Sequence, residues 1–117
     1  MDVSEALVAL APQAEWSMNA DDYNQLTWLS SDIPKPTLAE VNVKIEELKA
    51  AEPMRLLRRE RDRLIAETDW WVLPDRTPTD EQLAYRQALR DLPDNSTPVL
   101  DNTTRLGISG VIWPTKP

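Results

Sequence analysis

The sequence predicts an α+β fold that is mainly α, with three successive parts. Two capping-box patterns, Thr37–Glu40 and Thr79–Gln82, each precede a stretch with helical spacing of apolar residues. Ten prolines against two glycines break the rest of the chain into short segments. We therefore predict a small N-terminal module with a β-hairpin (1–36), a helical region that contains a helical hairpin (37–92), and a linker with an extended C-terminal arm (93–117).

Composition and charge argue against several classes of function. The chain has no Cys and no His, which removes thiolate metal sites and the usual general base near neutral pH. Acidic residues are plentiful, but no pair stands out as a hydrolase dyad, so we expect no enzyme activity, no cofactor and no metal. The net charge of −7 argues against nucleic acid as the main partner. No run approaches the roughly 18 apolar residues of a membrane span, and the acidic start is unlike a secretory signal.

The N-terminal module is expected to contain a short helix and a hairpin. Ser4–Leu10 fits two helical turns with Ser4 as the cap. Trp16–Asn19 and Tyr23–Leu29 flank an acidic turn, and the second run has the partial alternation of a strand. We interpret the acidic turn as solvated rather than as a cation site, because a calcium loop needs more oxygen ligands at set spacing.

Three helices are predicted at about 37–51, 53–67 and 79–92. Pro53 either kinks one long helix or begins a second one, and the sequence leaves both readings open. The first helix has an apolar stripe at heptad spacing, which favours packing in its own domain or in a short bundle. The stripe comprises Leu38, Val41, Ile45 and Leu48.

The second helix carries five arginines around an apolar face of Met54, Leu57, Leu64 and Ile65. Arg58–Asp62 and Arg63–Glu67 have the spacing of ion pairs one turn apart. Two interpretations stay open: a solvated, salt-bridged face, or a patch that docks an acidic or aromatic surface. The arginines are Arg55, Arg58, Arg59, Arg61 and Arg63.

A paired tryptophan, Trp70–Trp71, follows this helix, and the two side chains cannot both face one side of a regular element. We expect one to pack inward and the other to cover a neighbouring element or a partner. The third helix is expected to stop at Pro93. Residues 94–105 are predicted to be a polar linker. The apolar run 106–113 has no obvious strand partner, so it either folds back on the body or adds to another chain.

The stretch EPMRLLRRERDRLIAETDWW followed by TDEQLAYRQALRDLP resembles the C-terminal part of bacteriophage tail assembly chaperones, also described as tail fibre assembly proteins. Arg58–Trp70 and Tyr85–Asp91 carry the resemblance, and the closing VIWPTKP adds a weaker one. It implies a partner of a trimeric, β-rich tail fibre that assists folding or assembly by binding alone. It also implies action in the host cytoplasm during assembly, with retention in the virion tail and self-association left open.

The residues expected to bind the partner combine aromatic anchors with arginines. They are Arg58, Arg61, Arg63, Trp70, Trp71, Tyr85 and Trp113. The alternative is a structural baseplate or tail adaptor protein without chaperone action, because residues 1–52 carry a net charge of −7 and residues 53–117 carry none. That imbalance is consistent with a separate attachment module.

Overall fold

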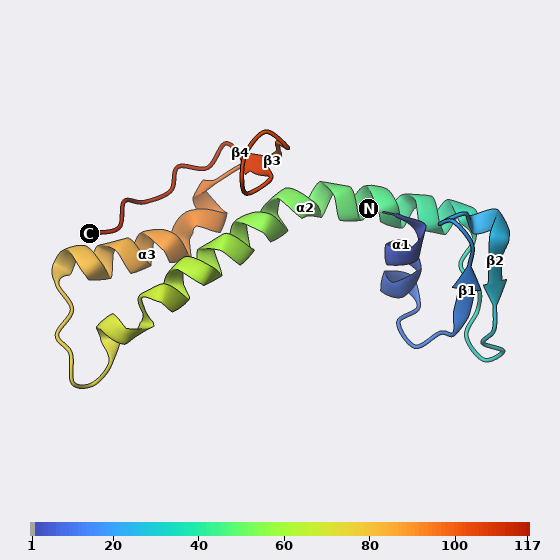
Figure 1. The fold of residues 1–117 in the computed structure, drawn as a ribbon, viewed down its shortest axis with the longest axis horizontal. Helices are drawn as coiled ribbons and strands as arrows, with labels where there is room; N and C mark the ends of the chain where they lie inside the picture. Colours follow the sequence, from blue (N-terminus) through green and yellow to red (C-terminus); the bar gives the residue numbers. More distant parts are fainter. Residues whose placement is uncertain (1) are drawn as a thin grey trace. The chain divides into compact units, whose positions relative to one another are not determined.

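The computed structural model describes residues 2–117, which form two compact units divided between Ala51 and Glu52 (Figure 1). Each unit has a hydrophobic core of its own. The predicted fold class is confirmed, because the described chain is mainly helical and has a small N-terminal hairpin. The division into 1–36, 37–92 and 93–117 stays a prediction.

The first unit begins with helix α1, Val3–Leu10. Asp2 rather than Ser4 is its cap, since the Asp2 carboxylate accepts a hydrogen bond from the Glu5 amide at 2.8 Å. The predicted cap was therefore wrong, because a carboxylate two residues earlier satisfies the first turn. The Asp21 carboxylate accepts from the amides of Val3 (3.2 Å) and Ser4 (3.1 Å). The acidic turn thus stabilises the helix start.

The hairpin consists of β1, Trp16–Met18, and β2, Leu26–Trp28, paired antiparallel with Trp16 opposite Trp28. The second strand is shorter than predicted, because Tyr23–Gln25 is a 3-10 turn capped by Asp22. Side chains from both strands pack on a buried cluster of Ala6, Leu7 and Val41. The hairpin therefore covers the core that α1 and the start of α2 share.

Two aromatic tips hold the connector between the hairpin and the long helix. The Tyr23 hydroxyl donates to the Pro36 carbonyl at 2.6 Å, and Trp28 Nε1 donates to the Ile33 carbonyl at 2.8 Å. Proline-containing connectors have few backbone donors, so the side chains satisfy these carbonyls instead.

Helix α2, Leu38–Glu67, is a single helix, so of the two readings left open at Pro53 the structure has one long helix in place of separate helices at about 37–51 and 53–67. Pro53 lies inside it and removes only one backbone donor. Val41 and Leu57 are fully buried in the cores of their respective units, which holds the helix on both sides of the proline. The predicted capping box at its start is confirmed, because Glu40 N donates to Thr37 Oγ1 at 3.1 Å and Thr37 N donates to Glu40 Oε1 at 3.2 Å.

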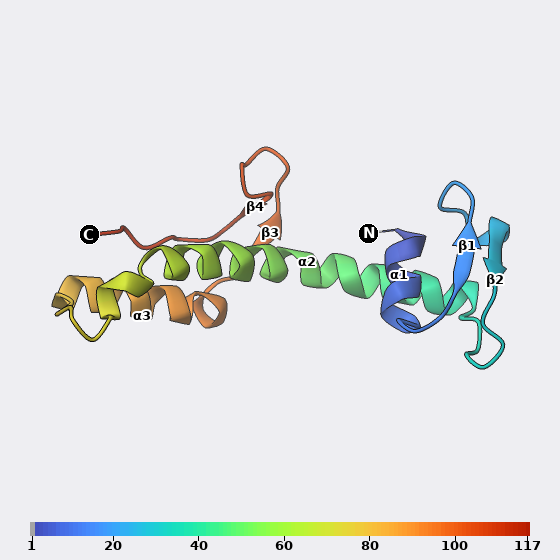
Figure 2. The same ribbon diagram turned by 60° about the horizontal axis from the view of Figure 1, so that its bottom comes forward.

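The second unit contains the predicted helical hairpin. After α2 comes a 3-10 turn, η2, Asp69–Val72, and then helix α3, Asp80–Asn95, which lies alongside the later part of α2 (Figures 1 and 2). The second capping box is confirmed, with Thr79 and Gln82 bonded in both directions. The helix runs past Pro93, contrary to prediction, because a proline near the end costs one hydrogen bond while Leu92 stays buried.

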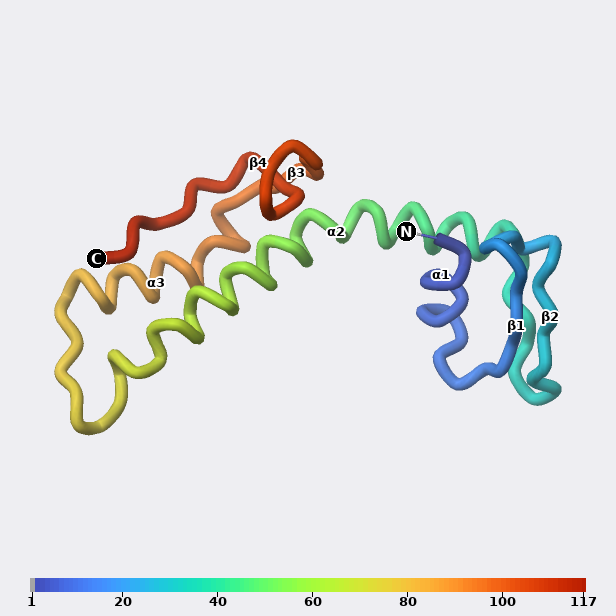
Figure 3. The backbone as a smooth tube through the Cα atoms, in the orientation of Figure 1, coloured from blue at the N-terminus to red at the C-terminus, as the bar shows by residue number. Residues whose placement is uncertain are grey.

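The C-terminal segment folds back on its own unit, which settles the alternative that the sequence left open. Strand β3, Val99–Leu100, pairs antiparallel with β4, Ile108–Ser109, so the apolar run does have a partner within the chain. The loop that joins them (Figure 3) closes when Asp101 N donates to the Gly107 carbonyl at 2.8 Å, with Gly107 at a φ of +80°. Ile108 is buried in the core of the unit.

Candidate partner-binding surface

The structure places the seven predicted partner-binding residues in the second unit, but not on one surface. Trp71 is 4% exposed and Tyr85 is 5% exposed, with their ring centroids 6.0 Å apart. Both belong to a cluster with Leu57 and Leu89, and Trp113 packs against its edge. Burial raises the pKa of the Tyr85 hydroxyl. Trp71 and Tyr85 therefore fill the core of the second unit, and Trp113 of the C-terminal segment packs against it.

Trp70 differs from its neighbour, because 47% of it is exposed. Its ring meets Trp71 edge to face at 6.2 Å, and the Arg76 guanidinium lies 4.6 Å from its centroid. The expected division of the tryptophan pair, with one side chain inward and one outward, is therefore confirmed. The Trp70 ring is thus held by two neighbours while nearly half of the residue stays exposed.

The arginines of α2 differ in how far they are engaged in ion pairs. Arg63 donates to both oxygens of the buried Glu60, at 2.6 and 2.9 Å, and forms the predicted pair with Glu67 at 2.5 Å. Asp62 pairs with Arg61 at 2.8 Å. The sequence had predicted a pair between Asp62 and Arg58 instead. Arg58 is exposed. Arg61 and Arg63 therefore belong to a salt-bridged face, while Arg58 remains a candidate for a docking patch.

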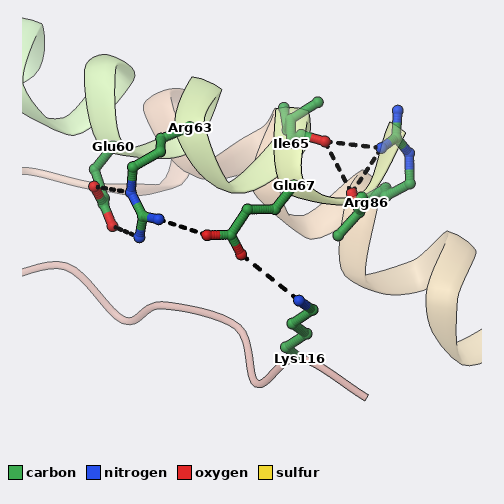
Figure 4. Close-up of polar contacts among 7 residues, drawn as sticks. Glu60, Arg63, Ile65, Glu67, Arg86 and Lys116 are labelled. Atoms are coloured by element: carbon green, nitrogen blue, oxygen red, sulfur yellow. Dashed lines mark hydrogen bonds and ion pairs between the residues drawn. The ribbon is translucent and has the colours of Figure 1, made fainter. Parts of the chain in front are cut away.

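The ion pairs of α2 reach the C-terminal segment (Figure 4). Arg105 lies 3.6 Å from Glu60, and Lys116 lies 3.6 Å from Glu67. The hydrogen bond from Arg63 is the main cause that lowers the pKa of the Glu60 carboxyl, and the same contact raises the pKa of Arg63. Carboxylates on α2 thus tie both the β3–β4 loop and the chain end to the helix.

Sequence reasoning missed Arg86, which is 8% exposed. Its Nη1 donates to the Thr68 hydroxyl at 2.7 Å and to the Ile65 carbonyl at 3.1 Å (Figure 4). Its Nη2 pairs with Asp69 at 3.2 Å. The available signal was an arginine between Tyr85 and Leu89, on the face of α3 that carries the apolar residues. A cation at such a position indicates a buried partner.

Above this interior the second unit exposes large apolar side chains, each 43% exposed or more. They occur in the turn after α2, on α3, in β3 and near the chain end. They are Trp70, Val72, Leu73, Leu83, Val99, Leu100 and Ile112. Contiguous exposed apolar side chains are typical of a protein-binding surface, and within this set Trp70, Val72 and Leu73 lie within four consecutive residues.

Within the described residues, no group of three or more His, Cys, Asp or Glu side chains is placed to hold a metal ion. None of the helices described is long and apolar enough to cross a membrane.

The fold and surface together define a small helical-hairpin binding protein. A family described as phage tail assembly chaperone protein matches residues 54–117, more than half of the chain, so the chain belongs to that family. This is a family of assembly chaperones and not a family of enzymes, and it implies a phage tail protein as partner. Neither a curated protein nor a solved structure matches the chain significantly.

Proposed function

We propose that this chaperone binds the tail fibre of its phage at the trimeric distal part. It assists folding or assembly of the fibre in the host cytoplasm and stays attached in the virion tail. The observation that carries the proposal is the exposed apolar set of the second unit, which lies within the residues matched to the family.

The turn after α2 supplies the anchor of this surface. Trp70, Val72 and Leu73 are all exposed within four consecutive residues, while Trp71 between them fixes the turn in the core. Interface anchors are most often aromatic residues held rigidly by packing. Of the seven predicted contact residues, Trp70, Arg58 and Arg63 are exposed, although Arg63 is also held in ion pairs with Glu60 and Glu67. Trp71 and Tyr85 support the surface from beneath.

The β3–β4 pair supplies a second feature that suits a β-rich fibre. A two-stranded sheet has two edges with backbone groups that can pair with another strand. Val99 and Leu100 of β3 are 53% and 54% exposed, so an added strand would also cover apolar surface. A fibre trimer forms slowly through non-local pairing and exposes its own edges meanwhile. A partner of this kind protects those edges until the trimer closes.

Co-expression with the fibre gene tests the proposal. The yield of soluble, detergent-resistant fibre trimer should rise with the chaperone present, and the two proteins should co-purify. Trp70→Glu and Leu73→Glu should abolish both effects. Leu29→Glu, an exposed apolar position in the first unit, is the control and should leave them intact. The proposal fails if trimer yield is the same with and without the chain.

A structural tail adaptor without chaperone action is the second candidate. The first unit has its own core and lies almost entirely outside the family match, as an attachment module would. Stoichiometric presence in purified particles, together with normal fibre trimers in a deletion phage, would favour this candidate over the first.

A further inference from the structure

The first unit carries an apolar groove that the function proposed above does not use. Two hollows of about 360 and 540 Å³ share Val43 and Glu47 of α2. The apolar residues that line them are Leu10, Ala39, Val43 and Ala50, and Val43 is 60% exposed. Ala39 to Ala50 spans about 16 Å, or three helical turns. We call this surface the Val43 groove.

The edges of the Val43 groove are acidic. Glu40, Glu46 and Glu47 line it against one lysine, Lys44. The side chains of Glu46 and Glu47 are 75% and 59% exposed, although each pairs with a lysine one turn away. The whole segment 1–51 holds nine acidic and three basic residues. The field around the groove therefore attracts a cationic partner.

We propose that the Val43 groove binds a basic amphipathic helix from another tail protein. The apolar stripe of that helix would cover Val43 and the two alanines, while its flanking Lys or Arg side chains would meet the glutamates. This is the helix-in-groove mode of recognition, and its acidic edges set the charge of the ligand. The groove precedes the family-matched residues 54–117, so it adds a second binding surface to the one proposed above.

A second copy of this chain fits the groove poorly. Two grooves face to face would place Glu40, Glu46 and Glu47 of each copy against one another. The basic half of α2 has the right charge, but its apolar residues Leu57, Leu64 and Ile65 pack in the core of the second unit. No basic apolar helix within the described residues is therefore free to serve as the ligand.

The test uses the full chain and a synthetic probe. The probe is a fluorescently labelled helical peptide of about four turns with a leucine stripe and Lys or Arg on its flanks; the comparison peptide has Glu at the flanking positions. Fluorescence anisotropy should show saturable binding of the basic peptide, weakened by salt, and much weaker binding of the acidic one. Val43→Glu should reduce the affinity at least about tenfold.

Three further variants sharpen the result. Val43→Ser removes apolar surface without adding charge and should also weaken binding. Glu40→Gln combined with Glu47→Gln should lower the affinity and flatten its salt dependence. Ala84→Glu, at an exposed position on α3 of the second unit, is the control and should bind as the parent chain does.

Four results would overturn the proposal. They are no binding of the basic peptide, equal binding of both peptides, unchanged binding by Val43→Glu, or a dimer in sedimentation analysis that Val43→Glu dissociates. The last result would assign the groove to a second copy.

Discussion

The guanidinium of Arg86 on α3 donates to the buried hydroxyl of Thr68 at 2.7 Å, eighteen positions earlier in the chain. Thr68 is fully buried and in turn donates to the Ile65 carbonyl at 3.0 Å. The last turn of α2 leaves carbonyls without intrahelical donors, and Arg86 satisfies one of them directly. Arg86 therefore helps to satisfy the end of α2, and it ties α3 to the turn that contains Trp70.

Replacing Arg86 with Met should lower the free energy of unfolding by about 2–4 kcal/mol, because Thr68 and the Ile65 carbonyl lose a buried donor. Arg86→Lys should recover little, since one ammonium cannot reproduce the fork that reaches three acceptors. Urea unfolding followed by circular dichroism measures both. Arg90→Met, an exposed position on the same helix, is the control and should change the value by no more than about 0.5 kcal/mol. Equal effects at the two positions would contradict this stabilising role of Arg86, which we call the Arg86 clamp.

Stability should fall at acidic pH through Glu60. The hydrogen bond from Arg63 holds the pKa of this carboxyl below the ordinary value of 4.5. Between that value and the lower folded-state pKa, the unfolded chain binds more protons than the folded one, so stability is present above 4.5 and is lost as pH falls through the folded pKa. Glu60→Gln should therefore be less stable than the parent chain near neutral pH, with the gap closing in acid.

Urea unfolding from about pH 6 to about pH 3 measures this gap. Glu52 and Asp101 also have lowered pKa values, but they are present in both proteins and cancel in the difference. Asp75→Asn, in the exposed loop before α3, reports the effect of removing a carboxylate that has no buried contact. A gap that stays constant with pH would show that Glu60 acts through packing alone.

Much of the fold could be predicted from the sequence because its signals are local. Two helix starts are marked by hydrogen bonds between residues three positions apart, Thr37 with Glu40 and Thr79 with Gln82. The prediction that α3 ends at Pro93 was wrong, because burial of Leu92 outweighs the loss of one backbone hydrogen-bond donor. Tertiary burial is decided by the whole unit and cannot be read from spacing.

The candidate site was harder to predict for a related reason. Polar-tipped aromatic residues indicated contact surfaces, yet several of them make contacts within the chain. Tyr23 and Trp28 hydrogen-bond to the connector before α2, while Trp71 and Tyr85 pack in the core of the second unit. Residue type alone does not distinguish these roles. The clamp through Arg86 joins residues 17 to 21 positions apart, beyond the reach of any local pattern.

The tryptophan pair allows stability to be separated from binding. Trp71→Ala should lower the free energy of unfolding by about 3–5 kcal/mol, because it empties the centre of a core. Trp70→Ala should cost no more than about 1 kcal/mol, the scale of its edge contact and its cation–π contact with Arg76. Urea unfolding compares the stabilities of the two variants, and co-purification with the fibre compares their binding. Similar destabilisation by both changes would mean that Trp70 is also structural.

The capping box at Thr79 sets where α3 begins, and so how firmly the exposed loop before it is held. Thr79 Oγ1 accepts from the Gln82 amide at 3.1 Å, and Gln82 Oε1 accepts from the Thr79 amide at 2.9 Å. Thr79→Ala should destabilise the second unit by about 1 kcal/mol, since it leaves a helix-terminal donor to water. Thr77→Ala, two residues earlier in the loop, removes the same atoms from an exposed site and should change stability by less than about 0.5 kcal/mol. Hydrogen exchange should show faster exchange of the Gln82 amide only in the first variant, and unchanged exchange there would contradict the cap.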